Sequence, residues 1–402
     1  MQDLKSLAFV GVDTHKDSHS VRLTDCFSRN LDTFDIRNDP RYFKELTLRV
    51  NAISNKYNLK PVFGLEDTQS YGQRLAKFLI STGNYVKEVP PVKTERKRAK
   101  SAHPDKSDSE DAGAIAKILI QDFDKLQTIN SFDELHLSIR ELSNQREALI
   151  KEQTKIKNRL HSIIYKQYPQ YQKMFKDAFS KSALAFWEKF PHPFYLKDVT
   201  VKELSLFLRS KSNKTISTKA AQRILSLTLV ENSLSELGSC RIKVIKSLIK
   251  HFHFLQNEIS LIVKELKGLL PKTGLKLETL TGVNTVAAAK LINYIGDINR
   301  FANSDKLAKC AGIAPADRSS GKKQRHRKSR GGRRKLHSTI YYIALTQIGK
   351  CKNGIPKNAK AGDYYRKKIA EGKSKKEALT CLMRRLCDII YAMMKNKTEY
   401  RP

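Results

Sequence analysis

The stretch LAFVGVDTHKDSHSVRLT, residues 7–24, contains two predicted strands joined by a short polar segment. Residues 7–12 form an apolar run that ends at Asp13, and residues 19–24 alternate in polarity. An uninterrupted apolar run predicts a buried strand, whereas alternation predicts a strand with one exposed face. Asp13 therefore follows directly on a buried strand, at the edge of the sheet that we expect here.

The elements that follow extend this pattern into an α/β domain. The apolar run PVFGLE (61–66) ends at Glu66, and YVKEVPP (85–91) predicts one more strand. Residues 70–83 and 108–123 carry apolar side chains at helical spacing. Strands that alternate with helices are typical of an α/β fold, which we expect for the first part of the chain.

Two heptad patterns occupy the middle of the chain. The first repeats an apolar residue every seven positions, at Leu135, Leu142, Leu149, Ile156 and Ile163. The second is an apolar seam that comprises Ile242, Ile245, Ile249, Phe252, Ile259, Val263, Leu266 and Leu270. Sustained heptads predict a coiled-coil helical arm, which pairs within one chain or between chains. Residues 168–238, between the two seams, are interpreted as a helical insert in this arm.

The C-terminal part begins at about residue 276 and is expected to be all-α. The sequence LKLETLTGVNTVAAAKLINYIGDI, which includes Gly282, has the pattern of a helix-hairpin-helix. Such a turn presents backbone N–H groups and a helix N-terminus to a phosphate, although plain helical packing explains the same pattern. Three further helices are expected over residues 333–348, 358–371 and 374–395.

The charge of the chain indicates a polyanionic partner. Its 76 Lys and Arg residues exceed its 40 Asp and Glu residues, which gives a formal net charge of +36. Residues 300–402 carry 28 basic and 7 acidic residues, whereas residues 1–92 carry 13 and 11. An excess of this size favours nucleic acid as the partner. A membrane is not expected, because no apolar run approaches the ~18–20 residues of a membrane span.

Cysteine usage and the N-terminal sequence indicate a reduced compartment. The six cysteines form no CxxC pair, so neither a zinc motif nor a redox motif is predicted. The N-terminus lacks the basic and apolar regions of a signal peptide. We therefore expect a cytoplasmic location, in association with the nucleoid.

Four carboxylates are candidate catalytic residues and metal ligands. Asp13 and Glu66 each follow a predicted strand. Asp108 and Asp111 are three residues apart on one face of a predicted helix. RNase H-like domains gather acids around a divalent metal in this way. Mg²⁺ suits an all-carboxylate site, and two ions ~4 Å apart would stabilise the attacking and leaving oxygens of phosphoryl transfer.

Other polar residues near these acids leave alternatives open. Asp105 replaces Asp108 as the ligand if the helix begins earlier. His15 and His19 are spaced like a metal-binding pair, but they follow a strand end and lack further histidine partners. We interpret both histidines as surface residues or as residues that support a metal ligand.

A dense basic run, ADRSSGKKQRHRKSRGGRRK, spans residues 316–335, and ten of its twenty residues are Lys or Arg. Ser319 and Ser320 lie just ahead of its basic core. The run is interpreted either as a phosphate-binding loop alone or as the surroundings of a reacting serine. The residues predicted to contact nucleic acid are Lys97, Arg98, Gly282, Lys322, Lys323, Arg325, Arg327, Lys328, Arg330, Arg333, Arg334 and Lys335.

At these residues the chain resembles the DEDD-type insertion-sequence transposases, relatives of the Piv DNA invertases. The segments FVGVDTHKDSHSVRL, FGLEDTQSYGQRLAKFLISTG and DKSDSEDAGAIAKIL look like the three acidic motifs of that family. The sequence from LTGVNTVAAAKLINYIGD to GGRRKLHSTIYYIAL is similar to its C-terminal transposase domain. The likeness covers about two-thirds of the chain, at its two ends.

The resemblance implies three regions. Residues 1–128 would form a RuvC-like (RNase H-like) domain with the DEDD acids. Residues 129–275 would form the coiled-coil arm, with its insert at about 168–238. Residues 276–402 would form the C-terminal transposase domain, which carries a nucleophilic serine.

The resemblance also implies a reaction and its partners. The four family acids correspond to the carboxylates named above, and the family's Ser-Gly pair corresponds to Ser320 and Gly321, with Ser319 as the adjacent alternative. Family members are bacterial or archaeal recombinases that excise and insert their element through a phosphoserine–DNA intermediate. The implied partners are donor and target DNA and, in some members, a structured noncoding bridge RNA. The chain would act as a homodimer or homotetramer, with acids and serine meeting within one chain or between two.

Two other functions fit the same residues. A metal-dependent nuclease of the Holliday-junction-resolving type would use water as its nucleophile and keep Ser320 as a structural residue. A nonenzymatic nucleic-acid-binding protein would carry a decayed acidic site, but the complete set of four acids disfavours this interpretation. Substitution of Ser320 therefore separates the transposase prediction from the nuclease alternative.

Overall fold

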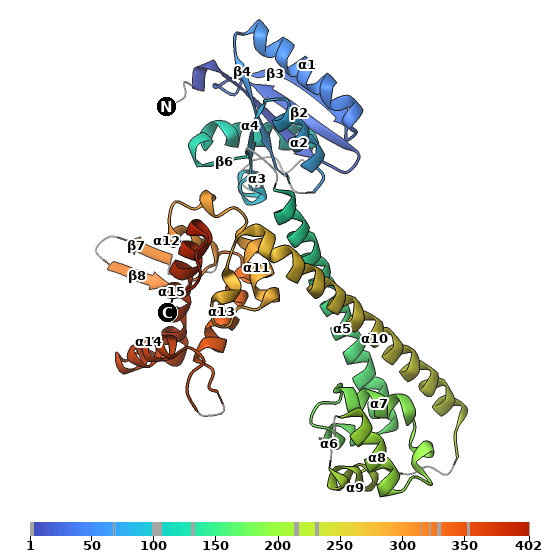
Figure 1. Cartoon of the computed structure of the whole chain (residues 1–402). Helices are drawn as coiled ribbons and strands as arrows, with labels where there is room; N and C mark the ends of the chain where they lie inside the picture. The colour runs from blue at the N-terminus through green and yellow to red at the C-terminus, as the bar shows by residue number, and fades with distance from the viewer. Residues whose placement is uncertain are drawn as a thin grey trace. The chain divides into compact units, whose positions relative to one another are not determined.

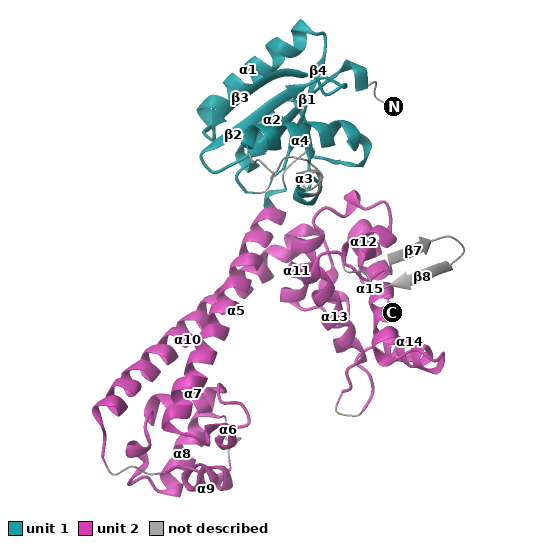
Figure 2. Cartoon of the chain, turned by 180° about the vertical axis from the view of Figure 1, so that it is seen from behind, with its two compact units in different colours: residues 1–134 teal, residues 135–402 magenta. Residues whose placement is uncertain are grey.

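The computed structural model describes residues 4–66, 68, 70–98, 107–129, 133–212, 217–229, 233–314, 316–320, 323–327, 331–351 and 354–401. For residues 96–98, 316–320 and 323–327 it describes the backbone alone. The chain divides into two compact units, residues 1–134 and residues 135–402 (Figure 2). Unit 1 is an α/β fold and unit 2 is mainly helical.

The described residues of unit 1 form a six-stranded sheet with the strand order β3-β2-β1-β4-β5-β6 (Figure 1). The strands are β1 (Leu7–Thr14), β2 (Ser18–Thr24), β3 (Asn30–Arg37), β4 (Lys60–Leu65), β5 (Tyr85–Glu88) and β6 (Gln127–Thr128). β1 runs parallel to β4 and antiparallel to β2, and β4 runs parallel to β5. The structure thus confirms the predicted α/β fold and places β1 in the interior of the sheet.

Helices cover both faces of this sheet. They are α1 (Pro40–Lys56), α2 (Gln73–Ser81), α3 (Pro91–Arg98) and α4 (Asp108–Gln121), with the 3-10 turns η1 (Leu4–Ser6) and η2 (Phe123–Lys125). Val10 packs in one core with Phe43 of α1 and Leu75 of α2. Phe9 packs in a second core with Ile115 of α4. Because successive strand residues point to opposite faces, β1 is buried along its whole length.

Unit 2 begins with a helical arm. Helices α5 (Glu134–Gln167) and α10 (Glu236–Leu269) are 34 residues long and lie side by side (Figures 1 and 2). The heptad residues Leu149, Ile156 and Ile249 are buried in one apolar core. The structure confirms the two long helices, while their pairing as a coiled coil stays a prediction.

Short helices join the two arm helices, as the sequence predicts. They are α6 (Tyr171–Met174), α7 (Lys181–Lys189), η3 (Pro193–Leu196), α8 (Val201–Lys211) and α9 (Thr218–Ser226). Trp187 is buried at their centre, with its ring centroid 4.9 Å from that of Phe186 and 5.3 Å from that of Tyr168. The indole Nε1 donates a hydrogen bond to Ala178 O at 2.9 Å, so this polar group is satisfied although it is buried.

The remaining part of unit 2 is a group of helices and short turns. They are η4 (Leu270–Thr273), η5 (Leu277–Thr279), α11 (Thr285–Ile295), η6 (Ile298–Arg300), α12 (Ser304–Cys310), α13 (Arg334–Ile348), α14 (Ala359–Ala370) and α15 (Lys375–Asn396). The last three correspond to the three helices that the sequence predicts here. None of the described helices is both long and apolar enough to span a membrane.

The all-α expectation for this region is wrong in one place. Strands β7 (Ala316–Ser320) and β8 (Lys323–Arg327) pair antiparallel within the basic run. A helix would bring Lys323 and Arg327 together at i, i+4, where like charges repel. In strand β8 the backbones of these two residues lie four positions, roughly 13 Å, apart, although the register still sets Arg318 opposite Arg325.

The predicted helix-hairpin-helix is present only in its second half. Gly282 has a φ of +88° and precedes α11, whose N-cap Asn284 accepts a hydrogen bond from Ala287 N. The segment before the glycine is a 3-10 turn of three residues, η5. A full helix does not precede it, because Pro271 and the left-handed Gly274 interrupt the chain after α10.

Candidate active site

A glycine lets helix α4 lie directly on strand β1. A Cβ at Gly11 would be 2.1 Å from Ala112 O and 2.6 Å from Ala116 N, both in α4. Any side chain at this position would therefore push the helix backbone away from the strand. Asp13, two residues further along β1, lies on the same face of the sheet and next to Asp108 of α4.

Asp13 and Asp108 come together around the imidazole of His15. His15 Nε2 is 3.0 Å from Asp13 Oδ2 and 3.3 Å from Asp108 Oδ1. One ligand atom from each of the three residues lies within 4.8 Å of the others. The Asp13 side chain is 9% exposed, whereas His15 and Asp108 are 41% and 54% exposed, so the cluster opens to solvent.

The charge balance of this cluster favours a bound cation. Burial raises the pKa of Asp13 above its ordinary value, His15 opposes this effect, and the charges of Asp111 and Asp108 reinforce it. The ionised form of Asp13 therefore gains from any positive charge nearby. The two carboxylates are oxygen donors that fit a divalent metal ion, and the His15 imidazole forms a hydrogen bond with Asp13.

The first turn of α4 supplies two acids and is fixed by a cap. Ser107 Oγ accepts a hydrogen bond from Glu110 N at 3.2 Å, and the helix begins at Asp108. Asp111 lies one turn further along and is buried. The N-terminus of a helix favours negative charge, which suits both acids. The alternative acid, Asp105, lies outside the described residues.

Glu66 lies at the same edge of the sheet as Asp13. β1 and β4 are parallel neighbours, and Val12 pairs with Leu65, so Asp13 and Glu66 each follow one member of this pair. Glu66 Oε1 accepts a hydrogen bond from Thr94 Oγ1 at 2.9 Å. The structure therefore brings Glu66 to the acidic edge, although it stands outside the close cluster of three residues.

The two histidines of the first motif have different environments. His15 supports two of the predicted acids, in agreement with one of the two interpretations offered for it. The prediction that His19 is a surface residue is wrong. His19 is fully buried, and its ring centroid lies 6.3 Å from that of Phe43 in α1. Burial lowers the pKa of His19 from 6.5 to about 4.

The basic run forms a hairpin whose base is held by two glycines. Gly312 and Gly332 have φ values of +65° and +99°, and a Cβ on Gly332 would be 2.5 Å from Gly312 N. Arg333 N donates a hydrogen bond to Cys310 O at 2.7 Å. These contacts hold together the chain segments on either side of the hairpin, at positions where only glycine fits.

The predicted nucleophile lies at the other end of the hairpin. Ser320 is the last residue of β7 and pairs with Lys323, while Ser319 pairs with Gln324. The predicted residues Gly321, Lys322, Lys328 and Arg330 lie outside the described residues. The backbone alone is described for Lys97 and Arg98 in α3 and for Lys323, Arg325 and Arg327 in β8. Ser320 belongs to unit 2 and the acids belong to unit 1.

Two of the predicted phosphate-binding cations have protein partners. Lys335 Nζ is 2.7 Å from Glu147 Oε2, and Arg333 Nη1 donates a hydrogen bond to Tyr294 O at 2.8 Å. Glu147 also accepts a hydrogen bond from Tyr294 OH. Burial acts to raise the pKa of Glu147, but the bonds from Lys335 and Tyr294 outweigh it and hold the pKa below its ordinary value. Glu147 thus connects α5 to α11 and α13, a role that the sequence does not indicate.

Arg334 and Gly282, the other two predicted nucleic-acid contacts that are described beyond the backbone alone, differ in their surroundings. Arg334 is the first residue of α13 and is exposed. A Cβ on Gly282 would be 3.2 Å from both Ile343 O and Thr346 Cβ, so the turn packs closely on α13. Close packing accounts for this glycine, and a phosphate contact at Gly282 stays a prediction.

Comparisons with known proteins connect both regions to transposases. Residues 10–169 match the DEDD transposase family of IS110, and residues 275–365 match the Transposase IS116/IS110/IS902 family. The first match contains the four predicted acids, and the second contains Ser320. DEDD transposases are typically metal-dependent, which agrees with the cluster of Asp13, His15 and Asp108.

Similar proteins match the chain over nearly its whole length. The Insertion element IS116 uncharacterized 44.8 kDa protein of Streptomyces clavuligerus is 25% identical over 401 residues, which cover 98% of this chain and 96% of that protein. The Insertion element IS110 uncharacterized 43.6 kDa protein of Streptomyces coelicolor is 24% identical, with 98% and 95% covered. The Pilin gene-inverting protein of Moraxella bovis is 21% identical, with 98% of each chain covered.

Proposed function

The chain belongs to the IS110-type transposase family, and on this premise we propose that it cleaves and rejoins DNA with the acids of unit 1 and Ser320 of unit 2. The observation that carries the proposal is the meeting of Asp13 and Asp108 at one edge of the sheet, beside the strand that ends before Glu66. Carboxylates gathered in this way are the ligands of metal-assisted phosphoryl transfer.

Asp13 and Asp108 would hold the metal ion, with Glu66 and Asp111 completing the acidic set. Mg²⁺ is the proposed ion, because carboxylate oxygens are hard ligands. When bound, it would supply positive charge to the phosphate that reacts. Burial of Asp13 supports this role, because a buried carboxylate gains most from a cation beside it.

Ser320 is the proposed nucleophile. Its Oγ would form a bond to phosphorus as the bond from phosphorus to one deoxyribose oxygen breaks, so that the serine loses its proton and the released oxygen gains one. A hydroxyl of another strand would then attack the same phosphorus and release the serine. The number of phosphate ester bonds stays constant, so no external energy source is needed. Arg334 and the basic residues of β8 would offset the negative charge that develops.

Donor and target DNA are the proposed substrates, with a structured bridge RNA as guide and a homodimer or homotetramer as the active assembly. The net charge of +36 and the two-helix arm support these partners. Sequencing of nucleic acid that copurifies with the full-length protein tests the guide. One discrete RNA encoded by the element supports guided recombination, and random fragments alone contradict it.

A covalent adduct tests the nucleophile. Full-length protein that retains its copurifying nucleic acid, incubated with Mg²⁺ and labelled DNA from the element ends, should give a protein–DNA band that persists on a denaturing gel. Ser320→Ala should abolish this band, whereas the neighbouring substitution Ser319→Ala should keep it. Cleavage by Ser320→Ala without an adduct would instead indicate the Holliday-junction-type nuclease. DNA binding without any cleavage by the unchanged protein would indicate the nonenzymatic alternative.

A further inference from the structure

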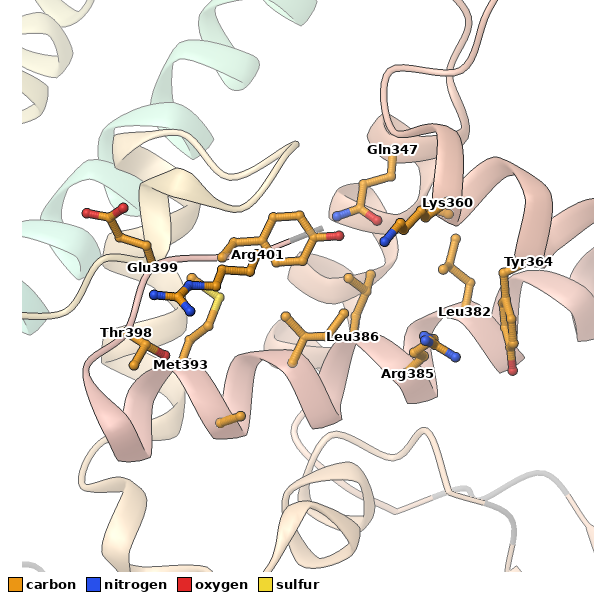
Figure 3. Close-up of a pocket in the computed structure, with 14 residues that line it drawn as sticks. Gln347, Lys360, Tyr364, Leu382, Arg385, Leu386, Met393, Thr398, Glu399 and Arg401 are labelled. Carbon is orange, nitrogen blue, oxygen red and sulfur yellow. The ribbon is translucent and has the colours of Figure 1, made fainter.

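A pocket of about 600 Å³ lies among the C-terminal helices of unit 2 (Figure 3). Its lining comes from α13, α14, α15 and the tail that follows α15. Pockets of ~300–1,000 Å³ are the usual size for small organic ligands, a range that includes a nucleotide. Within the described part of the chain, no residue of the lining belongs to the predicted catalytic or phosphate-binding set. The pocket therefore needs an explanation of its own.

One side of the pocket is apolar. Leu382, Leu386 and Met393 lie on one face of α15, line the pocket and are buried. Tyr364 of α14 and Tyr400 of the tail add two aromatic rings to the lining. A nucleobase stacks on surfaces of this kind, because every base has an apolar face.

The rim of the pocket is cationic. Lys360, Arg385 and Arg401 line it, and all three are exposed (Figure 3). Among the described lining residues the one carboxylate is that of Glu399, which is paired with Lys276 at 2.9 Å. The charge that faces an occupant is therefore positive, and a phosphate would complement it.

The walls of the pocket are held by contacts within the protein. Tyr400 OH accepts a hydrogen bond from Asn358 Nδ2 at 3.2 Å, and Tyr400 N donates one to Thr279 Oγ1 at 2.9 Å. These bonds fix the tail that closes one side. The guanidinium of Arg385 lies 5.2 Å from the ring centroid of Tyr364, which orients this cation at the rim. A preformed site loses little conformational freedom on binding.

We propose that this pocket holds one unstacked nucleotide of a nucleic-acid strand, with its base on the apolar side and its phosphate at the cationic rim. The inference rests on the proposed function, since a recombinase handles strands whose bases are unpaired. The amide of Gln347 also lines the pocket; its Nε2 donates a hydrogen bond to Thr281 O at 2.8 Å, and amide oxygens accept hydrogen bonds from base edges in nucleic-acid complexes. A strand is favoured over a free nucleotide because two exposed residues, Lys357 just before α14 and Lys367 within it, extend the positive charge.

A filled pocket tests the proposal. Ala392 is an exposed lining residue, so Ala392→Trp fills the pocket without a change of charge. Ala370→Trp makes the same change at an exposed position outside the lining. Fluorescence anisotropy of the full-length variants with labelled 12-nucleotide single strands and a duplex of the same sequence gives the affinities. Thermal unfolding checks that the variants are folded.

Ala392→Trp should weaken binding of single strands about 10-fold and leave duplex binding within about 2-fold, while Ala370→Trp changes neither. Lys360→Ala should weaken single-strand binding and reduce the slope of its salt dependence by about one. DNA and RNA single strands are separate arms, and the strand that shows the loss is the occupant. Equal loss for single strands and duplex, or no loss in either arm, overturns the proposal. Competition by free AMP as strong as that by the oligonucleotide overturns the assignment to a strand.

The adduct assay at Ser320 separates this inference from the proposed reaction. An adduct in the unchanged protein, together with full single-strand binding by Ala392→Trp, supports the proposed reaction and contradicts the nucleotide site. Loss of single-strand binding in Ala392→Trp, with no adduct in the unchanged protein, supports the nucleotide site and contradicts the proposed reaction.

Discussion

The acidic edge of unit 1 and the basic hairpin of unit 2 are held in place by different means. Asp13 lies near the end of a strand that is buried on both faces, and α4 reaches it because Gly11 has no side chain. The hairpin is held at its base by Gly312 and Gly332, and Ser320 lies at its far end. Packing therefore sets the positions of the acids, whereas backbone pairing along two short strands sets the position of the serine.

The two regions also differ in charge. Residues 1–92 have a net charge of +2, and residues 300–402 have a net charge of +21. A nearly neutral and well-packed frame suits carboxylates that, under the proposed function, share a cation within a few ångströms. A highly charged surface segment suits contact with a long polyanion. We therefore expect substitutions at the acidic edge to act through position and those near the hairpin to act through charge and anchoring.

The strongest test of this contrast is Asp13→Asn, which keeps the shape of the side chain and removes its charge. We expect Mg²⁺-dependent DNA cleavage to fall at least ~10³-fold while DNA binding is retained, because the acid would act on the reacting phosphate. The matched control is Asp17→Asn, at an exposed aspartate four residues away. The rate of DNA cleavage is measured for both variants. An unchanged rate for Asp13→Asn would show that Asp13 takes no part in the reaction.

Gly11→Ala probes the packing that brings the acids together. The added Cβ would collide with the backbone of α4, so we expect a loss of about 3 kcal/mol in the free energy of unfolding. Gly268→Ala is the control, because a Cβ there meets nothing within 4 Å in helix α10, and it should be neutral or slightly stabilising. Urea unfolding measures both. Equal stability for the two variants would show that α4 does not depend on this glycine.

His19 makes the stability of the packed region depend on pH. The pKa of His19 is about 4 in the folded chain, and its ordinary value is 6.5, which applies in the unfolded chain. As the pH falls, the unfolded chain therefore binds the extra proton at a higher pH than the folded chain does. Its contribution to stability is present above pH 6.5 and is lost as the pH falls toward 4. We expect a loss of about 2 kcal/mol between pH 7 and pH 5, and a smaller loss in His19→Leu. Denaturant unfolding at the two pH values measures this, and identical losses in the two proteins would contradict the assignment.

Glu147→Gln tests the anchoring of α13, the helix that follows the hairpin. The change removes the ion pair with Lys335 and weakens the hydrogen bond from Tyr294, at a cost of about 1 kcal/mol. The folded pKa of Glu147 is lowered, so its contribution is present near neutral pH and is lost as acid protonates it. Glu152→Gln, an exposed position on the same helix, should leave the melting temperature unchanged. The same melting temperature for both variants would contradict the prediction that Glu147 anchors α13.

Sequence patterns predicted the elements whose apolar residues recur at regular spacing. Strands β1 and β4, the arm helices and the three last helices fall in this group. β3 escapes prediction because it is an edge strand with exposed positions, and its sequence NLDTFDIR is mostly polar. The pairing of β7 with β8 also escapes, because Lys and Arg residues carry little strand preference and pairing depends on a partner strand.

The sequence by itself determined which carboxylates follow strands, where a serine precedes a basic run, and where the charge of the chain is concentrated. These are local properties, so that apolar spacing and residue type are enough to predict them. Only the tertiary structure decided that His15 contacts both Asp13 and Asp108, that His19 is buried, and that Lys335 pairs with Glu147. Apart from the contact of His15 with Asp13, these contacts and this burial join residues that are far apart along the chain, and the packing of one element on another brings them together.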